Sequence, residues 1–369
     1  MSEAFEILLV TAPGLETLLA DEAREGGFDV RGTIPGGVTV LGNWPDVWRA
    51  NLELRGAGRV LARIGEFRAF HLAQLDKRSR KFPWAEVLRP DQPVKVEVTT
   101  SKASKIYHAG AAAQRVETAI KETLGAPISD DAEIRIKLRI DDNLCTFSLD
   151  TSGESLHKRG HKEAVGKAPM RENLAALFLR DCGYTGTESV VDPMCGSGTF
   201  IIEAAEIALG LRPGRSRAFA FEKLATFDQA AWDVLRTLTE PKSTNLRFYG
   251  SDRDGGAIKM SRANAERAGV AGCTEFSHNA VSDLMRPEGD PGLVIVNPPY
   301  GARIGDRKLL FSVYGALGKT LLERFRGWRV GMVTSDAGLA KSSGLPFLPV
   351  SNQVAHGGLK ISLFKTDPL

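Results

Sequence analysis

Three short segments of the sequence place polar residues directly after apolar, strand-like runs. The first is VVDPMCGSGTFIIEAA at residues 190–205, where the apolar run ends at Asp192 and a turn with Gly196 and Gly198 opens a helical pattern. Glycine lets the backbone approach a ligand closely, and a helix N-terminus favours a negative group such as a carboxylate. The segment lacks the Gly-Lys-Ser/Thr of a phosphate-binding loop and the glycine spacing of a dinucleotide site. It therefore predicts a small-ligand loop of another kind.

The second segment, FYGSDRD at residues 248–254, ends its apolar run at Asp252. A carboxylate at the end of a parallel strand can accept hydrogen bonds from both ribose hydroxyls of a nucleoside. The same side chain could instead cap a helix that begins near Gly255. The presence of the first segment favours the ribose interpretation.

The third segment is LVIVNPPYGARIG at residues 293–305. Two prolines remove two backbone donors after Asn297, so the outward-facing groups are acceptors, namely the Asn297 side-chain oxygen and the Pro298 carbonyl. An exocyclic amino group of a base has two N–H donors that match these acceptors. The ring of Tyr300 can stack on the same base. The segment therefore predicts recognition of a base amino group, with a plain proline turn as the alternative.

A parallel sheet is expected to position these three segments. Apolar strands alternate with helical patterns through the second half of the chain. The predicted strands are 189–191, 247–251, 274–277, 293–296 and 329–334, with a hairpin arm at 359–365. This alternation is typical of an α/β fold with a doubly wound, mostly parallel sheet, here followed by a C-terminal antiparallel hairpin. Ligands in such sheets bind beyond the carboxyl ends of the strands, where all three segments lie.

The first half of the chain predicts an α+β module in two parts. The first part has strands at 5–10, 37–41 and 60–67 and helices at 14–24 and 45–54; the second has strands at 93–99, 134–140 and 144–150 and a helix at 110–124. Residues 152–169 are polar and basic, which predicts a linker or an interaction loop. Residues 211–245 interrupt the strand–helix rhythm as an insertion of unassigned role, with a predicted helix at 227–239.

The composition is that of a globular protein with two or three domains. The chain has 369 residues, of which 43% are hydrophobic and 25% charged. Its four cysteines form no C-x-x-C pair, so neither a zinc site nor a disulfide framework is predicted. His157 and His161 lie four apart without a nearby third ligand, and we predict no metal. Without a signal peptide or a run of about 20 apolar residues, the expected location is the cytoplasm.

Charge is distributed unevenly along the chain. The net charge is −5 over residues 1–49, +5 over 50–170 and +3 over 171–369. A basic middle region is expected if it meets phosphates, although an unevenly charged, solvated surface is the alternative. The candidate RNA-binding residues are Lys77, Arg78, Arg80, Lys81, Lys102, Lys105, Lys158, Arg159 and Lys162.

DPMCGSGTF, GSD and NPPYG resemble motifs I, II and IV of class I amino-methyltransferases. TAPGLETLLADE, the hairpin through SLDTSGESLHKRGHK, and APMRENLAALFL at 168–179 resemble the THUMP-containing RNA guanine-N2 methyltransferases, and the resemblance covers nearly the whole chain. It implies a ferredoxin-like subdomain at 1–65, a THUMP RNA-binding domain at 66–157, a linker at 158–168 and a Rossmann-like methyltransferase domain at 169–369.

The resemblance also implies site residues. The catalytic residues, which bind the target base, are Asn297, Pro298, Pro299 and Tyr300. The residues that bind the cofactor, S-adenosyl-L-methionine, are Asp192, Pro193, Cys195, Gly196, Ser197, Gly198, Thr199, Asp252, Asn279 and Asn297. Where this family usually has an acidic residue after the third strand, the chain reads HNAVSDL. Asn279 takes the aligned position for the adenine contact, and Asp283 is the alternative.

The expected reaction is methyl transfer to the exocyclic N2 amine of a guanosine in structured RNA, either 23S rRNA or tRNA. Oxygens at Asn297 and Pro298 would orient the amine and stabilise the developing charge. Three alternatives remain open: a protein glutamine-amide N-methyltransferase, a DNA or RNA adenine-N6 methyltransferase, and a non-catalytic RNA-binding factor. The basic strand at 134–140 favours RNA over protein. A DNA methyltransferase would usually carry a large target-recognition insertion, and the sequence shows none. Cys195 is predicted to be a small packed residue, not a nucleophile.

Overall fold

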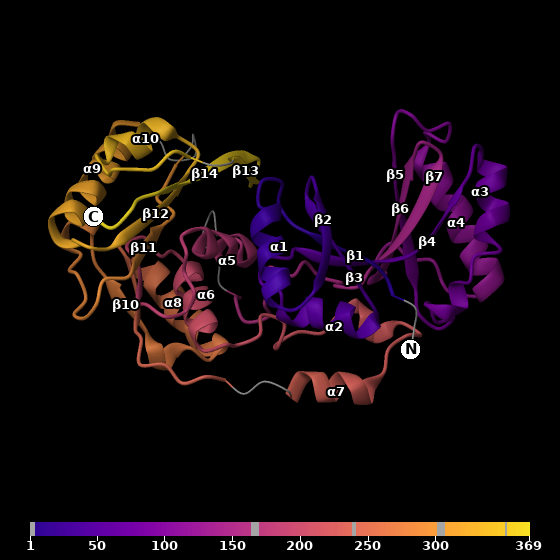
Figure 1. Ribbon diagram of the computed structural model, residues 1–369, viewed down its shortest axis with the longest axis horizontal. Coiled ribbons are helices and arrows are strands. Elements are labelled where there is room, and N and C mark those ends of the chain that lie inside the picture. The colour runs from indigo at the N-terminus through magenta and orange to yellow at the C-terminus, as the bar shows by residue number, and fades with distance from the viewer. Residues whose placement is uncertain (1–3, 164–169, 238–240, 301–306, 351–352) are drawn as a thin grey trace. The chain divides into compact units, whose positions relative to one another are not determined.

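The computed structural model describes residues 4–163, 170–237, 241–300, 307–350 and 353–369. The chain folds into two compact units, which Figure 1 shows in ribbon form. The first consists of Met1–Thr11, Ala20–Leu156 and Arg217–Thr239, and the second of Ala12–Leu19, His157–Ser216 and Glu240–Leu369. Among the described residues, no helix is both long enough and apolar enough to span a membrane.

The first unit begins with a four-stranded antiparallel arrangement. Its elements are β1 (Phe5–Val10), the part of α1 (Glu16–Glu25) from Ala20 onward, β2 (Asp29–Ile34), β3 (Gly37–Gly42), α2 (Trp44–Glu53) and β4 (Arg59–Arg68). The strand order β2-β3-β1-β4 is that of a ferredoxin-like fold. Asn43 begins α2 with a capping box, because its side chain accepts from the Asp46 N–H while Asp46 accepts from the Asn43 N–H.

The same sheet continues on the far side of β4. Strand β4 pairs with β7 (Leu144–Asp150), which pairs with β6 (Ile134–Asp141), and β5 (Val94–Thr100) lies parallel to β6 at the edge. The ten-residue β4 serves both halves, since Ile7–Val10 of β1 pair with its first residues and β7 pairs along most of its length. The helices here are α3 (Leu72–Ser79) and α4 (Ala109–Leu124), and a short 3-10 turn, η1, spans Trp84–Glu86.

Part of the predicted insertion belongs to the first unit. Residues 217–239 carry η2 (Ala220–Lys223) and α7 (Gln229–Thr237). Phe221 stacks on Trp48 of α2 with ring centroids 6.1 Å apart and meets Trp232 of α7 edge-on at 5.0 Å. Trp232 is 1% exposed. The segment therefore completes the aromatic core of the first unit, although it lies between strands of the second in sequence.

The second unit is a doubly wound sheet in the order β10-β9-β8-β11-β12-β14-β13. Its strands are β8 (Val190–Asp192), β9 (Phe248–Asp252), β10 (Thr274–His278), β11 (Leu293–Val296), β12 (Arg329–Thr334), β13 (Gln353–His356) and β14 (Leu359–Lys365). The first five run parallel, and β14 joins antiparallel to β12 and β13. This confirms the predicted mostly parallel sheet with a C-terminal antiparallel hairpin.

Five longer helices belong to the second unit. They are α5 (Glu172–Asp181), α6 (Thr199–Ala208), α8 (Gly255–Ala268), α9 (Arg307–Arg324) and α10 (Ala337–Ser342), and the short turns are η3 (Ala271–Cys273) and η4 (Val281–Asp283). Val294 and Val296 of β11 pack with Tyr314 of α9 and with Leu339 of α10 in one buried cluster. The sheet order places β9, β8 and β11 side by side, so the ends of the three motif-bearing strands are neighbours.

The described part of the predicted linker at 158–168 is packed into the second unit, which contradicts the prediction. Arg159 and His161 are 1% and 4% exposed, and His157–Ser216 belongs to the second unit. Arg159 pairs with Glu203 and His161 Nε2 lies 3.5 Å from Glu206 Oε1, both on α6, so a segment with few apolar residues is nevertheless packed. Residues 164–168 of the predicted linker lie outside the described residues.

Candidate active site

The loop between β8 and α6 is held from several sides. Gly196 N–H donates to Asp252 Oδ2 at 3.0 Å, Cys195 N–H donates to the Ser251 carbonyl at 2.9 Å, and Gly198 N–H closes a tight turn onto the Cys195 carbonyl at 2.7 Å. These bonds join the first two motifs directly. The loop is thus a preformed cradle and not a flexible connection.

Two glycines of the loop adopt left-handed backbone conformations. Gly196 has φ +53° and Gly198 has φ +84°. A Cβ at Gly196 would meet nothing within 4 Å, which shows open space beside the backbone. A Cβ at Gly198 would come within 3.1 Å of Ser261 Oγ. Gly196 therefore leaves room for a ligand to approach, whereas Gly198 allows α8 to pack closely.

Two residues that sequence reasoning missed hold the loop from α8. Ser261 Oγ donates to the Gly196 carbonyl at 2.8 Å, and Asn264 Nδ2 donates to the Ser197 carbonyl at 3.0 Å. Both side chains are fully buried. Their i, i+3 spacing places them on one face of α8. The available signal in the sequence was a pair of polar residues with that spacing on the helix that follows the strand ending at Asp252.

The two carboxylates at the strand ends differ in environment. Asp252 accepts from the N–H groups of Gly196 and Asp254 and stays partly exposed. Asp192 is 2% exposed and accepts from the Met194 N–H at 3.0 Å. Burial raises the pKa of Asp192 to about 8, and the nearby Asp252 charge adds to the effect. A cation bound beside Asp192 would compensate its charge.

The remaining predicted loop residues are packed. Pro193 and Ser197 are buried, and Cys195 is a free thiol that is 6% exposed. Burial raises the pKa of the Cys195 thiol well above its ordinary value, so the thiolate needed for a nucleophile is disfavoured. Thr199 begins α6 and is 5% exposed.

Asn297 follows the last residue of β11 and keeps an unused acceptor. Its Oδ1 is buried and has no hydrogen-bond partner in the part of the chain that the structure describes. Pro298 is buried beside it, and Pro299 and Tyr300 are partly buried. Tyr300 packs against the cluster that contains Val296 and Tyr314. An unpaired buried amide oxygen is costly unless a ligand supplies a donor, and an amino group is a donor of the required kind.

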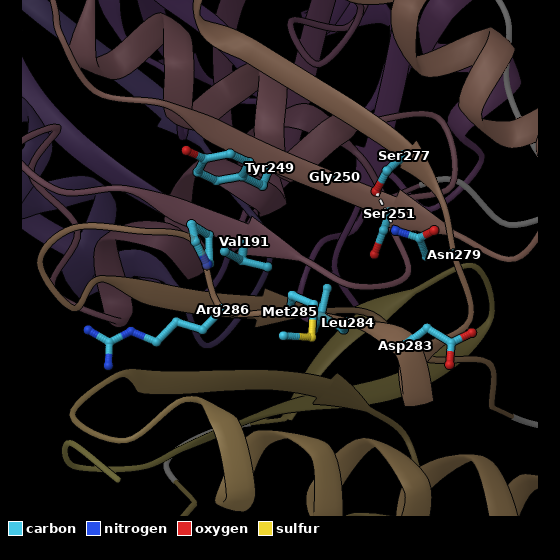
Figure 2. A pocket seen from close by; sticks show the side chains of 11 residues that line it. Val191, Tyr249, Gly250, Ser251, Ser277, Asn279, Asp283, Leu284, Met285 and Arg286 are labelled. Atoms are coloured by element: carbon cyan, nitrogen blue, oxygen red, sulfur yellow. Dashed lines mark hydrogen bonds between the residues drawn. The ribbon is translucent and has the colours of Figure 1, made fainter.

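A pocket of about 230 Å³ adjoins the ends of β9 and β10. Figure 2 shows Tyr249, Ser251 and Ser277 around it, together with Asn279 and Asp283. Asn279 Nδ2 donates to Ser277 Oγ at 3.1 Å, which leaves Asn279 Oδ1 as an acceptor. The Asn279 N–H also bonds to the Asp252 carbonyl at 3.1 Å. Asn279 and Asp283, the two candidates for the adenine contact, therefore line one pocket.

The candidate RNA-binding residues fall into three groups. Lys77, Arg78 and Lys81 are exposed on and after α3, Lys102 and Lys105 are exposed before α4, and Lys158 is exposed in the second unit. Arg80 lies with them but is paired, since its guanidinium bonds to both Asp76 and Glu122.

Among the described residues, no group of three or more His, Cys, Asp or Glu side chains is placed to hold a metal.

Arg159 and Lys162 do not fit the prediction that they contact RNA. Arg159 is 1% exposed and its Nε lies 2.9 Å from Glu203 Oε1. The Lys162 side chain is 7% exposed and pairs with Glu172 at 3.1 Å. Both charges are turned into the second unit, so neither side chain can reach a phosphate from this conformation. A run such as HKRGHK shows charge but not which side chains find buried partners.

Two exposed aromatic side chains accompany Lys102 and Lys105. Tyr107 is 70% and Phe70 42% exposed, and Lys105 Nζ lies 5.6 Å from the centre of the Phe70 ring. The turn residue Asn143 fixes both segments, because its carbonyl accepts from the Ala69 N–H and its Oδ1 from the Lys105 N–H. We name Phe70, Lys102, Lys105 and Tyr107 the aromatic–basic platform. Its aromatic members were missed because no periodic pattern marks them.

Two family models match the chain. The model described as RMKL-like, methyltransferase domain (UPF0020) matches residues 159–345, and the RlmL ferredoxin-like domain matches residues 6–61. The first match covers the active-site loop, Asp252 and the NPPY segment, and the second covers most of β1, all of β2 and β3, and the first residues of β4.

Curated relatives agree with the family models. A Synechocystis protein named as an RNA methyltransferase is 33% identical over 370 residues, which cover 96% of this chain and 95% of that protein. Proteins named ribosomal RNA large subunit methyltransferase K/L, from Psychromonas ingrahamii and Allochromatium vinosum, are 34% and 36% identical over 91% and 92% of this chain. The chain spans about half of their length, namely 46% and 49%.

Solved structures resemble the chain along its whole length. A protein titled a predicted N6-adenine-specific DNA methylase from Listeria monocytogenes is 27% identical with a TM-score of 0.88, over 100% of this chain and 97% of that one. SMU.472, a methyltransferase by title, was crystallised with S-adenosylhomocysteine (SAH) and gives 27% identity and a TM-score of 0.86, over 100% and 99% of the two chains. With its loop, its strand-end carboxylates and its NPPY segment in place, the chain belongs to the family of RMKL-like methyltransferase domains.

Proposed function

We propose that the chain binds S-adenosylmethionine and transfers its methyl group to the N2 amine of a guanosine in structured RNA. The two relatives named as large-subunit ribosomal RNA methyltransferases favour 23S rRNA over tRNA as the substrate. The first unit supplies the RNA-binding surface in this proposal, with its second half acting as the THUMP domain.

The unpaired Asn297 oxygen is the observation that carries the proposal. It is buried without a partner at the end of β11, beside the strand that leads into the cofactor loop. A hydroxyl or carboxylate target offers at most one donor to this acceptor and the Pro298 carbonyl, whereas an amine offers two N–H groups. An amino group on a planar base therefore satisfies both acceptors and can stack on Tyr300.

The residues around the loop fit S-adenosylmethionine. Open space beside Gly196 accepts the amino-acid part, and Asp252 has further lone pairs for the ribose hydroxyls. The pocket beside Asn279 and Asp283 accepts the adenine, with Asn279 Oδ1 as the acceptor for its amino group. The cofactor, when bound, supplies a methyl group that its sulfonium has already activated. The chain's task is then to position the target amine and to stabilise the charge that develops on its nitrogen.

Each active-site residue has a defined part in this reaction. Asn297 Oδ1 and the Pro298 carbonyl accept the two amine hydrogens, which turns the nitrogen lone pair toward the cofactor loop. As positive charge develops on the nitrogen, the same two oxygens stabilise it, and one of the two amine protons is then released to water to leave the neutral methylamine. Pro298 and Pro299 restrict the backbone that follows Asn297, so little reorganisation is needed. Tyr300 holds the base in plane, and no side chain needs to form a covalent bond.

The aromatic–basic platform supports RNA as the partner. Unpaired bases stack on exposed aromatic rings while lysines meet the phosphates, and stacking contributes about 1–3 kcal/mol per base. Phe70 and Tyr107 provide the rings, and Lys102 and Lys105 provide the charge. A target base that must leave its stack to reach Asn297 is also more accessible in an unpaired segment.

Nucleoside mass spectrometry of rRNA and tRNA tests the proposal. We expect a strain lacking the gene to lose one N2-methylguanosine, and expression of the wild-type chain, but not of Asn297→Ala, to restore it. Fragment mapping would then locate the nucleotide and separate rRNA from tRNA. Loss of N6-methyladenosine instead would assign adenine as the target. An unchanged RNA profile would contradict the proposal and direct attention to glutamine methylation in proteins.

A further inference from the structure

Ser251 carries a hydroxyl without an assigned role near the end of β9. The residue is 3% exposed, and its Oγ has no hydrogen-bond partner in the part of the chain that the structure describes. An unpaired buried hydroxyl lowers the stability of a fold, and such groups are rare in native proteins. The unpaired Oγ is therefore explained best by a partner that arrives with a ligand.

The hydroxyl belongs to the pocket at the ends of β9 and β10. Ser251 and Tyr249 both line this pocket, and residues two positions apart on a strand point to the same face of the sheet. On β10, Ser277 is paired in register with Ser251 and lines the same pocket. Figure 2 shows the Ser251 side chain next to Ser277 and Asn279. The unpaired hydroxyl thus lies on the pocket side of β9.

This pocket has a polar end and apolar walls. Ser251, Ser277 and Asn279 form the polar end, whereas Val191 and Leu284 contribute apolar side chains. A flat heteroaromatic ring matches this arrangement, because its edge carries hydrogen-bonding atoms and its faces are apolar. Asn279 Oδ1 offers an acceptor, since Asn279 Nδ2 already donates to Ser277 Oγ, and the Ser251 hydroxyl offers a donor. The matching ring edge therefore has a donor next to an acceptor.

We propose that Ser251 is a specificity-determining residue for the adenine of the cofactor. Adenine carries an amino donor next to ring-nitrogen acceptors. The Ser251 hydroxyl donates to one of the two ring nitrogens nearest that amino group, N1 or N7, while Asn279 Oδ1 accepts from the amino group itself. Neighbouring strands lie about 4.8 Å apart, so side chains at the ends of β9 and β10 can contact adjacent atoms of one ring. This inference rests on the proposed function, because it assumes the same cofactor.

Binding of deaza analogues to the full chain tests the proposal. In 1-deaza-SAH and 7-deaza-SAH, a C–H group that cannot accept a hydrogen bond replaces one ring nitrogen. By isothermal titration calorimetry we expect Ser251→Ala to bind SAH about fivefold more weakly than the wild type does, the size of one neutral hydrogen bond. The wild type should bind one of the two analogues with a similar loss. Ser251→Ala should bind that analogue as well as it binds SAH.

The melting temperature of the ligand-free protein gives a second measurement. Because Ser251→Ala removes a hydroxyl that has no partner, the melting temperature should not fall. A serine whose hydroxyl only held the fold together would lower it when replaced. Ser79 on α3 is a matched control, since it is 0% exposed and its Oγ likewise lacks a partner among the described residues. Ser79→Ala should keep wild-type affinity for SAH and for both analogues.

Three results would overturn the proposal. Wild-type SAH affinity in Ser251→Ala would show that the hydroxyl makes no contact with the ligand. An equal loss for SAH and for both analogues would show that the substitution changes the shape of the pocket and removes no bond to a ring nitrogen. A lower melting temperature in Ser251→Ala than in Ser79→Ala would assign a structural role. If the wild-type chain bound neither SAH nor the analogues, the proposed function would fall as well, which distinguishes the two failures.

Discussion

At the scale of single residues, Asn297 separates catalysis from cofactor binding. Because its buried Oδ1 has no hydrogen-bond partner among the described residues, replacing it removes an acceptor for the amine but leaves the hydrogen bonds that hold the loop between β8 and α6. We expect Asn297→Ala to lower the methyl-transfer rate by about 100- to 1,000-fold, as when one preorganised charge-stabilising group is lost. SAH affinity measured by calorimetry should be unchanged.

Asn173 is a matched control for this substitution. It lies on α5, is 8% exposed, and its Oδ1 is likewise buried without a hydrogen-bond partner. Asn173→Ala should keep the methyl-transfer rate. If both variants lost activity equally, or if Asn297→Ala lost SAH binding, the assigned role of Asn297 would be wrong.

Asp192 predicts a pH dependence of cofactor binding. With its pKa raised to about 8, the carboxyl is mostly protonated at pH 7 in the free protein. The positive charge of S-adenosylmethionine favours the carboxylate, so affinity should rise from pH 6 to pH 9 and binding should release a proton. Calorimetry in two buffers of different ionisation enthalpy measures that proton. A flat profile in the wild type, or a rise that survives Asp192→Asn, would exclude this assignment.

Cofactor affinity should rise with pH, but the contribution of the same Asp192 carboxyl to folding stability should fall. Its pKa is raised from an unfolded value of 3.8, so between about pH 4 and pH 8 the folded chain binds more protons than the unfolded chain. Its contribution to stability therefore falls as the pH rises through that window.

Much of the candidate site is visible in the sequence, because each motif directly follows an apolar strand. Asp192, Asp252 and Asn297 were predicted at strand ends, and the parallel sheet makes those ends neighbours. Arg159 and Lys162 were assigned to the surface, because buried pairing with residues 10 to 44 positions away leaves no local pattern. The charge of a side chain does not show whether it is exposed to water or buried in an ion pair.

At the scale of elements, helix α7 should stabilise the first unit, although in sequence it lies between strands of the second unit. Trp232→Ala removes a ring that is 1% exposed and packs edge-on against Phe221. We expect the free energy of unfolding of the first unit to fall by about 3–5 kcal/mol. Hydrogen exchange read by mass spectrometry should then become faster in β1 and β4 but not in β11 and β12. Val234→Ala, at a side chain 59% exposed on the same helix, should change neither.

Elements with a strong periodic pattern were predicted to within a few residues. Leu144–Asp150, Leu293–Val296 and Arg329–Thr334 agree with the prediction at both ends. Strand β2 was missed because it is an edge strand with almost every residue exposed, so no alternation marks it. Helix α3 was missed because only Leu75 and Ser79 are buried, too few to reveal a helical period.

At the scale of the whole molecule, RNA affinity should divide into an ionic part and a stacking part. Lys102→Ala/Lys105→Ala removes two exposed charges and should reduce the slope of log affinity against log salt by about 2. Phe70→Ala/Tyr107→Ala should weaken binding by about 10- to 100-fold with the slope unchanged. Filter binding of rRNA fragments to the full chain across salt concentrations measures both. Equal slopes in wild type and the lysine variant would exclude phosphate contacts at the platform.

The division into units could not be predicted from the sequence. The family resemblance implied one methyltransferase domain at 169–369, yet 217–239 belongs with the first unit. Its aromatic residues are recognisable as apolar, but nothing in their spacing shows which core they enter. The partners, Trp48 above all, lie more than 150 positions earlier in the chain.

That discontinuity has a consequence for the order in which the protein is made. When Leu156 leaves the ribosome, the first unit still lacks the segment that covers Trp48, because Arg217–Thr239 has yet to be synthesised. The 83 residues between positions 156 and 239 take roughly 4–17 s at about 5–20 residues per second. During that interval the Trp48 ring that Phe221 later covers faces water on the nascent chain, and exposed apolar surface of this kind makes a folding intermediate prone to aggregation.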